Sequence, residues 1–310
     1  MPAVQSPAGP PASAGRFAPS PSGELHIGNL RTAMLAWLFA RSSGRRFLIR
    51  VEDLDRARAG FEAQQLEDLA AIGLDWDGEV VRQTDRGPIY QRALEQLAGA
   101  GLVYECFCTR REIAEAPSAP HAPEGAYPGT CRNLTDAERE ERRQGRPAAL
   151  RLRADTASYT VADRLHGDYT GLVDDFVLRR NDGVPAYNLA VVVDDAAQGV
   201  DQVVRGDDLL SSAPRQAYLA QLLELPPVEY AHVPLVLNER RRRLAKRDGA
   251  VTLGALAMVG FNSAAVRGML LESLGLPDVP LDRLAADFRP KALPLQPWIF
   301  DPPQVALSRG

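Results

Sequence analysis

The amino-acid sequence predicts an α/β protein whose core is a doubly wound parallel sheet, split by an insertion. Three observations support this fold class. Apolar residues recur at helical spacing after Leu30, a short apolar strand follows at residues 47–51, and further helical patterns come next. Helices that alternate with buried strands are typical of parallel sheets covered on both faces. The pattern fades over residues 106–180, where Pro, Arg and Ala are frequent, and it returns at residues 186–206.

The first half of the sheet is predicted from elements that follow one another closely. An amphipathic helix carries apolar residues at helical spacing, namely Leu30, Met34, Trp37 and Leu38. Gly44 follows as its C-cap, because glycine adopts the left-handed backbone that ends many helices. The strand at 47–51 leads into the acidic turn 52–55, and the next helix stops at Gly73. Ligands of parallel sheets bind at the carboxyl ends of the strands, so we expect the acidic turn to lie at the site.

The second half of the sheet follows a third helix and the insertion. Pro88 begins the third helix, since proline is tolerated in the first helical turn. Residues 186–195 and 202–206 are predicted as strands because regular alternation returns there. A further helix has Pro214 in its first turn, and the chain is mainly helical after Thr252.

These patterns divide the chain into regions. We expect a disordered tail at 1–15, a Rossmann-like domain in two halves at 16–105 and 181–255, an inserted subdomain at 106–180 and a helical region at 256–310. The first fifteen residues carry no charged side chain. They lack the basic start and the continuous apolar run of a secretory signal, so we interpret them as a tail.

Composition narrows the class of protein. A hydrophobic share of 45% is ordinary for a soluble globular chain, and a net charge of −4 provides no general basic field for coating nucleic acid. Three cysteines, an odd number, indicate a reduced cytoplasmic setting rather than a disulfide framework. No apolar run approaches the ~20 residues needed to cross a bilayer. We therefore expect no membrane contact, and nothing in the sequence implies an obligate protein partner.

The most specific motif lies at the start of the first helix. Residues 16–29 read Arg-Phe-Ala-Pro-Ser-Pro-Ser-Gly-Glu-Leu-His-Ile-Gly-Asn. A helix N-terminus attracts anions through its backbone N–H groups and its dipole, and Gly28 lets a ring or a phosphate approach the backbone. The segment resembles the His-Ile-Gly-His signature of class I aminoacyl-tRNA synthetases, in the form of the glutamyl and glutaminyl group. The resemblance implies that the two halves at 16–105 and 181–255 form a nucleotide-binding catalytic domain, and that His26, Gly28 and Asn29 contact ATP.

A second motif is basic. Residues 243–247 read Arg-Leu-Ala-Lys-Arg. They resemble the Lys-Met-Ser-Lys-Ser signature of the same family, which implies that Lys246 is a catalytic residue that contacts the ATP phosphates together with His26. Arg243 and Ala245 depart from the signature, and Ala245 removes a hydroxyl. The alternative interpretation is a solvated basic loop.

The family chemistry explains this set of cations. An amino-acid carboxylate attacks the α-phosphorus of ATP and pyrophosphate leaves, so the reaction needs positioning and charge neutralisation and no general base. His26, Lys246 and a Mg²⁺ ion would supply the neutralisation.

The amino-acid substrate implied by the resemblance is L-glutamate. A site for it needs about two cations and one anion, because glutamate carries two carboxylates and one ammonium. Arg16, Glu52 and Arg205 provide these charges, Tyr187 adds a hydroxyl, and Ser20 lies beside Arg16 in the motif. The family suggests that Arg205 and Tyr187 lie near the substrate side chain. The alternative is that both arginines form salt bridges at strand ends; two arginines also favour glutamate over glutamine.

The three cysteines belong to a predicted zinc site. Cys106 and Cys108 form a C-x-C pair, and Cys131 follows. His121 and Tyr127 are candidates for the fourth ligand, and imidazole is the commoner one in general. The resemblance, however, implies a Tyr-x-x-x-Cys pattern that Tyr127 and Cys131 match, so we prefer Tyr127. The alternative is three unrelated thiols.

Length directs the choice within the family. Only residues 256–310 follow the catalytic halves, which is too few for the anticodon-binding domain of a complete glutamyl-tRNA synthetase. The chain therefore resembles the short paralogues that activate glutamate and transfer it to the queuosine base of tRNA(Asp). Two alternatives are a minimal glutamyl-tRNA synthetase that charges the 3′ end and a non-catalytic RNA-binding paralogue.

A few other polar residues are given structural roles. We interpret them as turn, capping or core residues rather than ligands, and they are Asp194, Asp195, Asp207, Asp208, His166 and His232.

Overall fold

A computed structural model describes residues 13–115, 127–242, 244 and 251–301. In chain order the elements are β1 (Ala14–Phe17), α1 (Ile27–Ser42), β2 (Arg46–Val51), α2 (Phe61–Ala71), β3 (Val81–Arg82), η1 (Gln83–Arg86), α3 (Gly87–Gly99), β4 (Val103–Cys106), α4 (Arg110–Glu115), α5 (Asp136–Gly145), β5 (Ala149–Leu152), β6 (Ser158–Asp163), β7 (Gly167–Leu172), β8 (Val177–Arg179), α6 (Tyr187–Gln198), β9 (Val200–Gly206), η2 (Asp207–Ser212), α7 (Ala213–Leu222), β10 (Glu229–Val233), β11 (Val236–Leu237), α8 (Leu253–Met258), α9 (Ser263–Glu272), α10 (Leu281–Asp287), η4 (Pro290–Ala292) and β12 (Trp298–Ile299), where η marks a 3-10 helix. Within these residues, no helix combines the length and the apolarity that crossing a bilayer requires.

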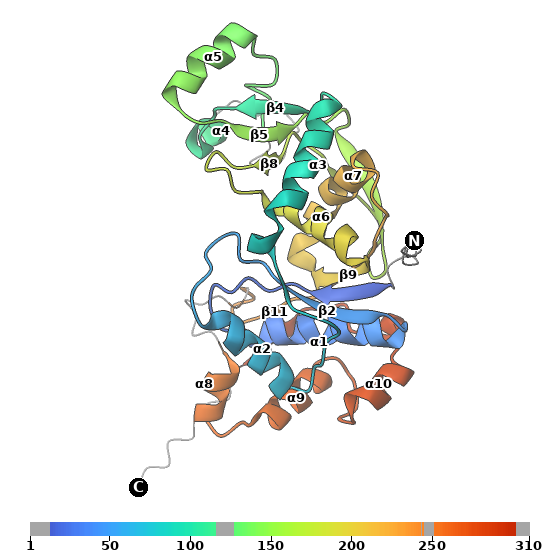
Figure 1. Ribbon diagram of the computed structural model, residues 1–310. Coiled ribbons are helices and arrows are strands. Elements are labelled where there is room, and N and C mark those ends of the chain that lie inside the picture. The colour runs from blue at the N-terminus through green and yellow to red at the C-terminus, as the bar shows by residue number, and fades with distance from the viewer. Residues whose placement is uncertain (1–12, 116–126, 243, 245–250, 302–310) are drawn as a thin grey trace, which may run out of the picture.

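The described residues contain a large sheet with the strand order β3-β2-β1-β9-β10-β6-β7. Its pairs are parallel except for β6 with β7. Helices cover both faces: in Figure 1, α1 lies on one side of the strands with α9 and α10, while α3, α6 and α7 lie on the other. The predicted doubly wound parallel sheet is therefore confirmed. A separate antiparallel sheet, β4-β5-β8, lies toward the end of the molecule that carries α4 and α5.

Successive side chains of the central strands point to opposite faces of the sheet, and both faces are buried, which explains the continuous apolar runs in their sequences. In β2, Phe47 and Ile49 belong to the cluster around α1, whereas Leu48 belongs to a cluster on the opposite face. In β9, Val204 and Val203 divide in the same way. Since both faces of the sheet are covered, both sets of side chains are apolar.

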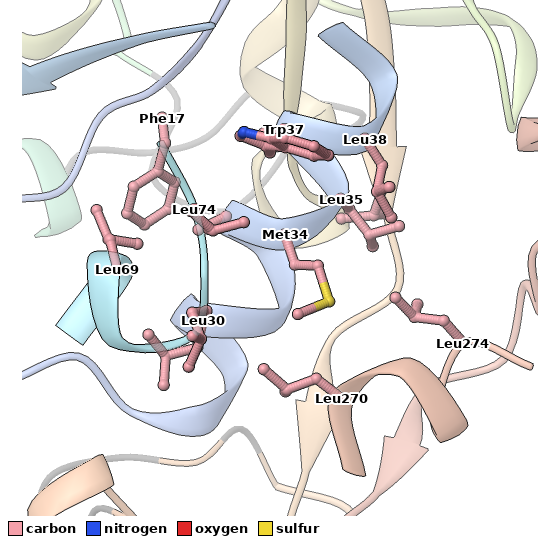
Figure 2. Packing of buried hydrophobic residues seen from close by; sticks show 14 of the residues in the cluster. Phe17, Leu30, Met34, Leu35, Trp37, Leu38, Leu69, Leu74, Leu270 and Leu274 are labelled. Carbon is pink, nitrogen blue, oxygen red and sulfur yellow. The ribbon is translucent and has the colours of Figure 1, made fainter. Parts of the chain in front are cut away.

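Helix α1 is more buried than the predicted amphipathic pattern implies. Its side chains pack between α2 and α9. Figure 2 shows Met34 of α1 between Leu69 of α2 and Leu270 of α9. Even Arg31 is buried, and its guanidinium donates to Pro234 O at 2.8 Å. The amphipathic interpretation is wrong because the C-terminal helices cover the outer face of α1. The predicted C-cap is one residue off: the C-cap is Ser43, and Gly44 follows it with the left-handed φ of 72° that ends the helix.

Three other sequence-based expectations need correction. Residues 186–195 were expected as a strand, but α6 spans Tyr187–Gln198, because an apolar run of that length is compatible with either structure. The predicted tail at 1–15 is too long, since β1 begins at the fully buried Ala14. The insertion at 106–180 is not one unit, because residues 158–172 form β6 and β7 of the large sheet.

Candidate active site

The segment between β1 and α1 is attached to the end of β2 and to α2. The backbone N–H of Glu52 donates to Pro19 O at 2.9 Å. The Gln65 amide donates to the carbonyl oxygens of Ser20 and Gly23 at 3.0 and 2.6 Å. The prolines of this segment have no backbone N–H to donate, so the segment is held through its carbonyl oxygens instead. Donors from the end of β2 and from α2 bond to these oxygens and fix the path of the segment beside Glu52.

His26 is the N-cap of α1 and forms a reciprocal pair with Asn29. The Asn29 N–H donates to His26 Nδ1 at 3.2 Å, and the His26 N–H donates to Asn29 Oδ1 at 3.2 Å. Because Nδ1 accepts a hydrogen bond, the neutral imidazole carries its proton on Nε2. His26 can therefore present an N–H donor to an anion while it caps the helix. Asn29 keeps the imidazole in this orientation.

Most backbone N–H groups at the start of α1 are already bonded. The Ile27 N–H donates to Val251 O at 2.9 Å, and those of Asn29 and Leu30 donate to His26 O at 2.8 and 3.1 Å. Among the residues that the structure describes, the Gly28 N–H has no hydrogen-bond acceptor. The anion-binding capacity expected of this helix start therefore rests on Gly28 N–H, on the His26 ring and on the helix dipole.

The absence of a side chain at Gly28 is explained by the His26 ring. A Cβ atom at position 28 would lie 2.9 Å from Cε1 and 3.0 Å from Nδ1 of that ring, and 3.4 Å from Cβ of Val236. The two separations from the ring are shorter than a normal van der Waals contact, whereas the separation from Val236 is ordinary. The imidazole thus occupies the space that any side chain at position 28 would need.

One cavity of about 500 Å³ lies at the carboxyl ends of β1, β2 and β9. It is lined by every described residue that the sequence predicts to contact ATP or glutamate, namely Arg16, Ser20, His26, Gly28, Asn29, Glu52, Tyr187 and Arg205. These residues come from four separate stretches of the chain. The geometry therefore brings them together.

Arg16 forms part of a buried ion-pair network. Its Nε lies 3.1 Å from Asp195 Oδ1, and Arg50 Nη1 lies 2.6 Å from the same oxygen. Arg50 Nη2 is 3.6 Å from Glu52 Oε1. Burial favours a protonated Asp195, but the two guanidiniums outweigh it and hold the pKa of that carboxyl below its usual range. Burial raises the pKa of Glu52, although Arg50 and Arg16 counteract the effect.

Arg205 has different partners. Its Nε donates to His232 Nε2 at 3.0 Å, and its two Nη groups donate to Tyr187 Oη and to Leu209 O, each at 3.4 Å. His232 Nδ1 in turn lies 2.6 Å from Asp163 Oδ2. Arg205 and His232 are both buried, so the cavity contains a second guanidinium with mainly neutral contacts.

Lys246, Arg243 and Ala245 lie outside the described residues, and their predicted roles stay predictions. The flanking positions are described. Leu244 and Val251 are buried in the same core cluster as α1. Val251 O accepts from Ile27 N–H, and Thr252 forms a β-bridge with His26. The chain therefore leaves this segment directly beside the start of α1.

The cysteines gather as the sequence predicts. The sulfur atoms of Cys106, Cys108 and Cys131 lie within 4.8 Å of one another. The Tyr127 hydroxyl is 3.3 Å from Cys106 Sγ and 3.7 Å from Cys108 Sγ. The Arg151 guanidinium stacks on the Tyr127 ring at 3.7 Å. Three thiols and a phenol around one point fit the four-ligand, sulfur-rich set of a structural zinc site. His121, the alternative fourth ligand, lies outside the described residues.

A second cavity of about 850 Å³ adjoins the first. The two share Ser20, Glu52, Arg56 and Tyr187 in their linings. The second is also lined by Cys106 and Cys108 and by four arginines, which are Arg110, Arg146, Arg151 and Arg180. The cysteine cluster thus borders a basic hollow that adjoins the predicted glutamate residues.

Sequence reasoning missed several residues of the site. Arg50 is in the middle of an apolar strand, and that position is the only signal that it forms buried ion pairs. Asp194 and Asp195 were interpreted as turn or capping residues, which is wrong, since both are buried in α6 and Asp195 pairs with Arg16. Nothing in the sequence pattern connects His232 with Arg205.

Comparisons with known proteins are consistent with this geometry. The family model described as tRNA synthetases class I (E and Q), catalytic domain, matches residues 14–277. A Nocardia farcinica protein named Glutamyl-Q tRNA(Asp) synthetase is 67% identical over 288 residues, which are 93% of this chain and 93% of that protein. A Cutibacterium acnes protein of the same name is 54% identical over 86% of this chain and 77% of its own length. A crystal structure of a glutamate tRNA ligase from Elizabethkingia meningosepticum, in complex with its amino acid, has a TM-score of 0.78 and 26% identity, covering 94% of this chain and 67% of that one.

Proposed function

The chain belongs to the class I tRNA synthetases of the glutamyl and glutaminyl type, and from this premise we propose that it activates L-glutamate with ATP and transfers it to the queuosine base of tRNA(Asp). The observation that carries the activation step is the single cavity in which Arg16, Arg205 and Glu52 lie together at the start of α1. The queuosine acceptor is supported by the names of the two relatives above.

The charges of the cavity suit a dicarboxylic amino acid. We propose that Glu52 receives the substrate ammonium, with Ser20 beside it. Arg205 and the Tyr187 hydroxyl would receive the side-chain carboxylate. Arg16 adds the second cation, although its charge is shared with Asp195 at 3.1 Å. Charge-assisted hydrogen bonds of this kind discriminate against amino acids that lack the second carboxylate.

ATP would bind at the start of α1. His26 Nε2–H and Gly28 N–H would donate to phosphate oxygens, and Lys246 would add a cation from the segment that ends at Val251. The glutamate carboxylate attacks the α-phosphorus, the bond to the bridging oxygen breaks, and pyrophosphate leaves. The protein residues orient the two reactants and stabilise the charge on the phosphoryl oxygens. Mg²⁺ would neutralise further phosphate charge when bound.

We propose that Cys106, Cys108, Tyr127 and Cys131 hold a structural Zn²⁺ ion. The metal would fix the strand β4 and the loop around Cys131 to each other. Cys106 and Cys108 line the basic hollow beside the glutamate cavity, so the site would shape the surface next to which the RNA substrate is held. Free cysteines are stable in the cytoplasm, which we propose as the location of the enzyme.

Glutamate-dependent exchange between pyrophosphate and ATP tests the activation step. The wild type should exchange without added RNA, and Lys246→Ala should lower the rate by roughly 10²–10³ while glutamate still binds. Absence of exchange in the wild type would favour a non-catalytic paralogue. An unchanged rate in Lys246→Ala would remove the role given to that lysine.

Transfer of labelled glutamate tests the acceptor. Three RNAs should be compared: tRNA(Asp) with queuosine, the same RNA with unmodified guanosine, and the queuosine form without its 3′-terminal adenosine. The proposal predicts transfer to the first and third only. Transfer that requires the terminal adenosine would support the alternative, a glutamyl-tRNA synthetase that charges the 3′ end, which the likeness to the Elizabethkingia ligase keeps open.

A further inference from the structure

We propose that the buried Asp163–His232 pair is a positioning device that orients Arg205 toward the side-chain carboxylate of glutamate. The proposal rests on the proposed function, since it takes glutamate as the ligand of the cavity. It concerns two residues that do not line the cavity themselves. Their contribution would act through Arg205.

Three neighbouring strands supply the three residues. His232 on β10 is the register partner of Arg205 on β9, and β10 also pairs with β6, which ends at Asp163. Asp163 and His232 are buried, at 5% and 0% exposure. Strands of one sheet hold their side chains at fixed separations, so the geometry of the chain Asp163–His232–Arg205 is set by the sheet.

The hydrogen bonds allow only one protonation pattern. Asp163 Oδ2 accepts from His232 N–H at 3.1 Å and lies 2.6 Å from His232 Nδ1. A guanidinium only donates, so His232 Nε2 must accept from Arg205 Nε at 3.0 Å. Nδ1 must therefore carry the proton and donate to Asp163, and His232 is neutral. The other Asp163 oxygen accepts from the backbone N–H groups of Leu165 and His166 at 2.9 and 3.0 Å, which fixes the carboxylate in turn.

A neutral partner leaves the charge of Arg205 uncompensated. Arg16 is paired with the carboxylate of Asp195, whereas no carboxylate of the described residues forms an ion pair with Arg205 within 4 Å. Of the two predicted substrate arginines, Arg205 thus keeps the larger attraction for an incoming anion. A carboxylate in place of His232 would orient the guanidinium equally well but would weaken that attraction.

A matched pair of substitutions separates orientation from simple packing. In His232→Asn, the side-chain amide can replace Nδ1 and bond to Asp163, but it is too short to reach Arg205. In His232→Gln, the amide oxygen can take the place of Nε2 and accept from Arg205. Losing a hydrogen bond that orients a charged group should raise the KM for glutamate in His232→Asn roughly 10–100-fold. The KM for ATP should stay unchanged, and the preference for glutamate over glutamine should shrink.

His232→Gln should recover most of the glutamate affinity. His166→Gln is the control, because the His166 ring hydrogen-bonds to the backbone carbonyl of His232, at 3.0 Å, and not to Arg205. The bond from His166 to Asp163 comes from the backbone N–H, which the substitution keeps. It should retain the wild-type KM for glutamate. Exchange kinetics and calorimetric titration with L-glutamate should be measured on all three variants and on the wild type.

A spectroscopic measurement on the wild type does not depend on the folding of a variant. The ¹⁵N chemical shifts of the His232 ring at neutral pH should report a neutral imidazole with its proton on Nδ1. A proton on Nε2 would overturn the proposal. So would a wild-type KM for glutamate in a folded His232→Asn protein. If the wild type itself neither exchanges nor binds glutamate, the proposed function fails first, and this inference fails with it.

Discussion

The most informative single substitution is Gly28→Ala, because it should separate stability from activity. The added Cβ would lie 2.9 Å from Cε1 of the His26 ring and 3.0 Å from its Nδ1. Val236 stands 3.4 Å away on another side. The imidazole therefore has to move, and its hydrogen bond from Asn29 N–H, 3.2 Å long, is lost or bent.

Two stability terms oppose each other. Losing a helix N-cap costs about 0.5–2 kcal/mol. Replacing glycine by alanine inside a helix stabilises it by up to about 1 kcal/mol. The net change should stay within about 1 kcal/mol, which corresponds to about 1–2 °C in Tm for a chain of this size.

Activity should fall much further. Removing or misaligning one donor to the developing phosphoryl charge should lower glutamate-dependent ATP–pyrophosphate exchange by about 10²–10³. The KM for glutamate should change little, because Arg205 and Glu52 do not contact the substituted position. Exchange kinetics, glutamate titration and thermal unfolding measure the three quantities.

Gly87→Ala is the matched control. Gly87 also lies in the first turn of a helix, α3, and a Cβ there meets nothing within 4 Å. This variant should exchange at the wild-type rate. A Gly28→Ala enzyme that is as active as Gly87→Ala would refute the role assigned to the His26 ring.

Three further substitutions test the rest of the site. Asp195→Asn leaves Arg16 and Arg50 without their shared carboxylate and should lower the free energy of unfolding by about 3–5 kcal/mol at pH 7. The pKa of Asp195 is lower in the folded than in the unfolded state, so the stability that this carboxylate adds is present above the unfolded pKa and is lost as pH falls through the folded pKa. Denaturant unfolding should therefore show that the difference in free energy of unfolding between wild type and Asp195→Asn becomes smaller in acid. Glu52→Gln should raise the KM for glutamate by about 10–100-fold with little change in the KM for ATP, and equal shifts in both would contradict its contact with the ammonium. Cys131→Ser should purify with less than one equivalent of zinc and a lower Tm, and metal analysis that finds full occupancy would contradict the four-ligand site.

The sequence predicted those parts of the site whose geometry is local. His26, Gly28 and Asn29 form one helical turn, so a four-residue motif determines how they lie with respect to each other. The C-x-C and Tyr-x-x-x-Cys spacings act in the same way for the cysteine cluster. The three helices and the strand β2 before residue 105 also followed from periodicity, whereas the strands β1, β3 and β4 were not predicted.

Contacts between distant elements could not be predicted in this way. The run Ala-Val-Val-Val-Asp-Asp in α6 has β-branched residues and no helical periodicity, since that helix is buried on several sides, and it was therefore taken for a strand. The position of Asp195 beside Arg16 follows only from the three-dimensional structure. Residues 158–172 likewise gave no strong signal, because β6 and β7 expose much of their surface.

Val251, which follows the basic motif, is attached to the start of α1 for a physical reason that neither sequence pattern reveals. The first N–H group of α1, at Ile27, needs an acceptor, because no residue of the helix can supply one. Val251 O supplies it at 2.9 Å, and the neighbouring Thr252 bridges to His26 and caps α8. The same bonds therefore complete the start of α1 and anchor the residues that follow the lysine motif. Any movement of Val251 and Thr252 would therefore act directly on the backbone at the start of α1, where His26 and Gly28 lie.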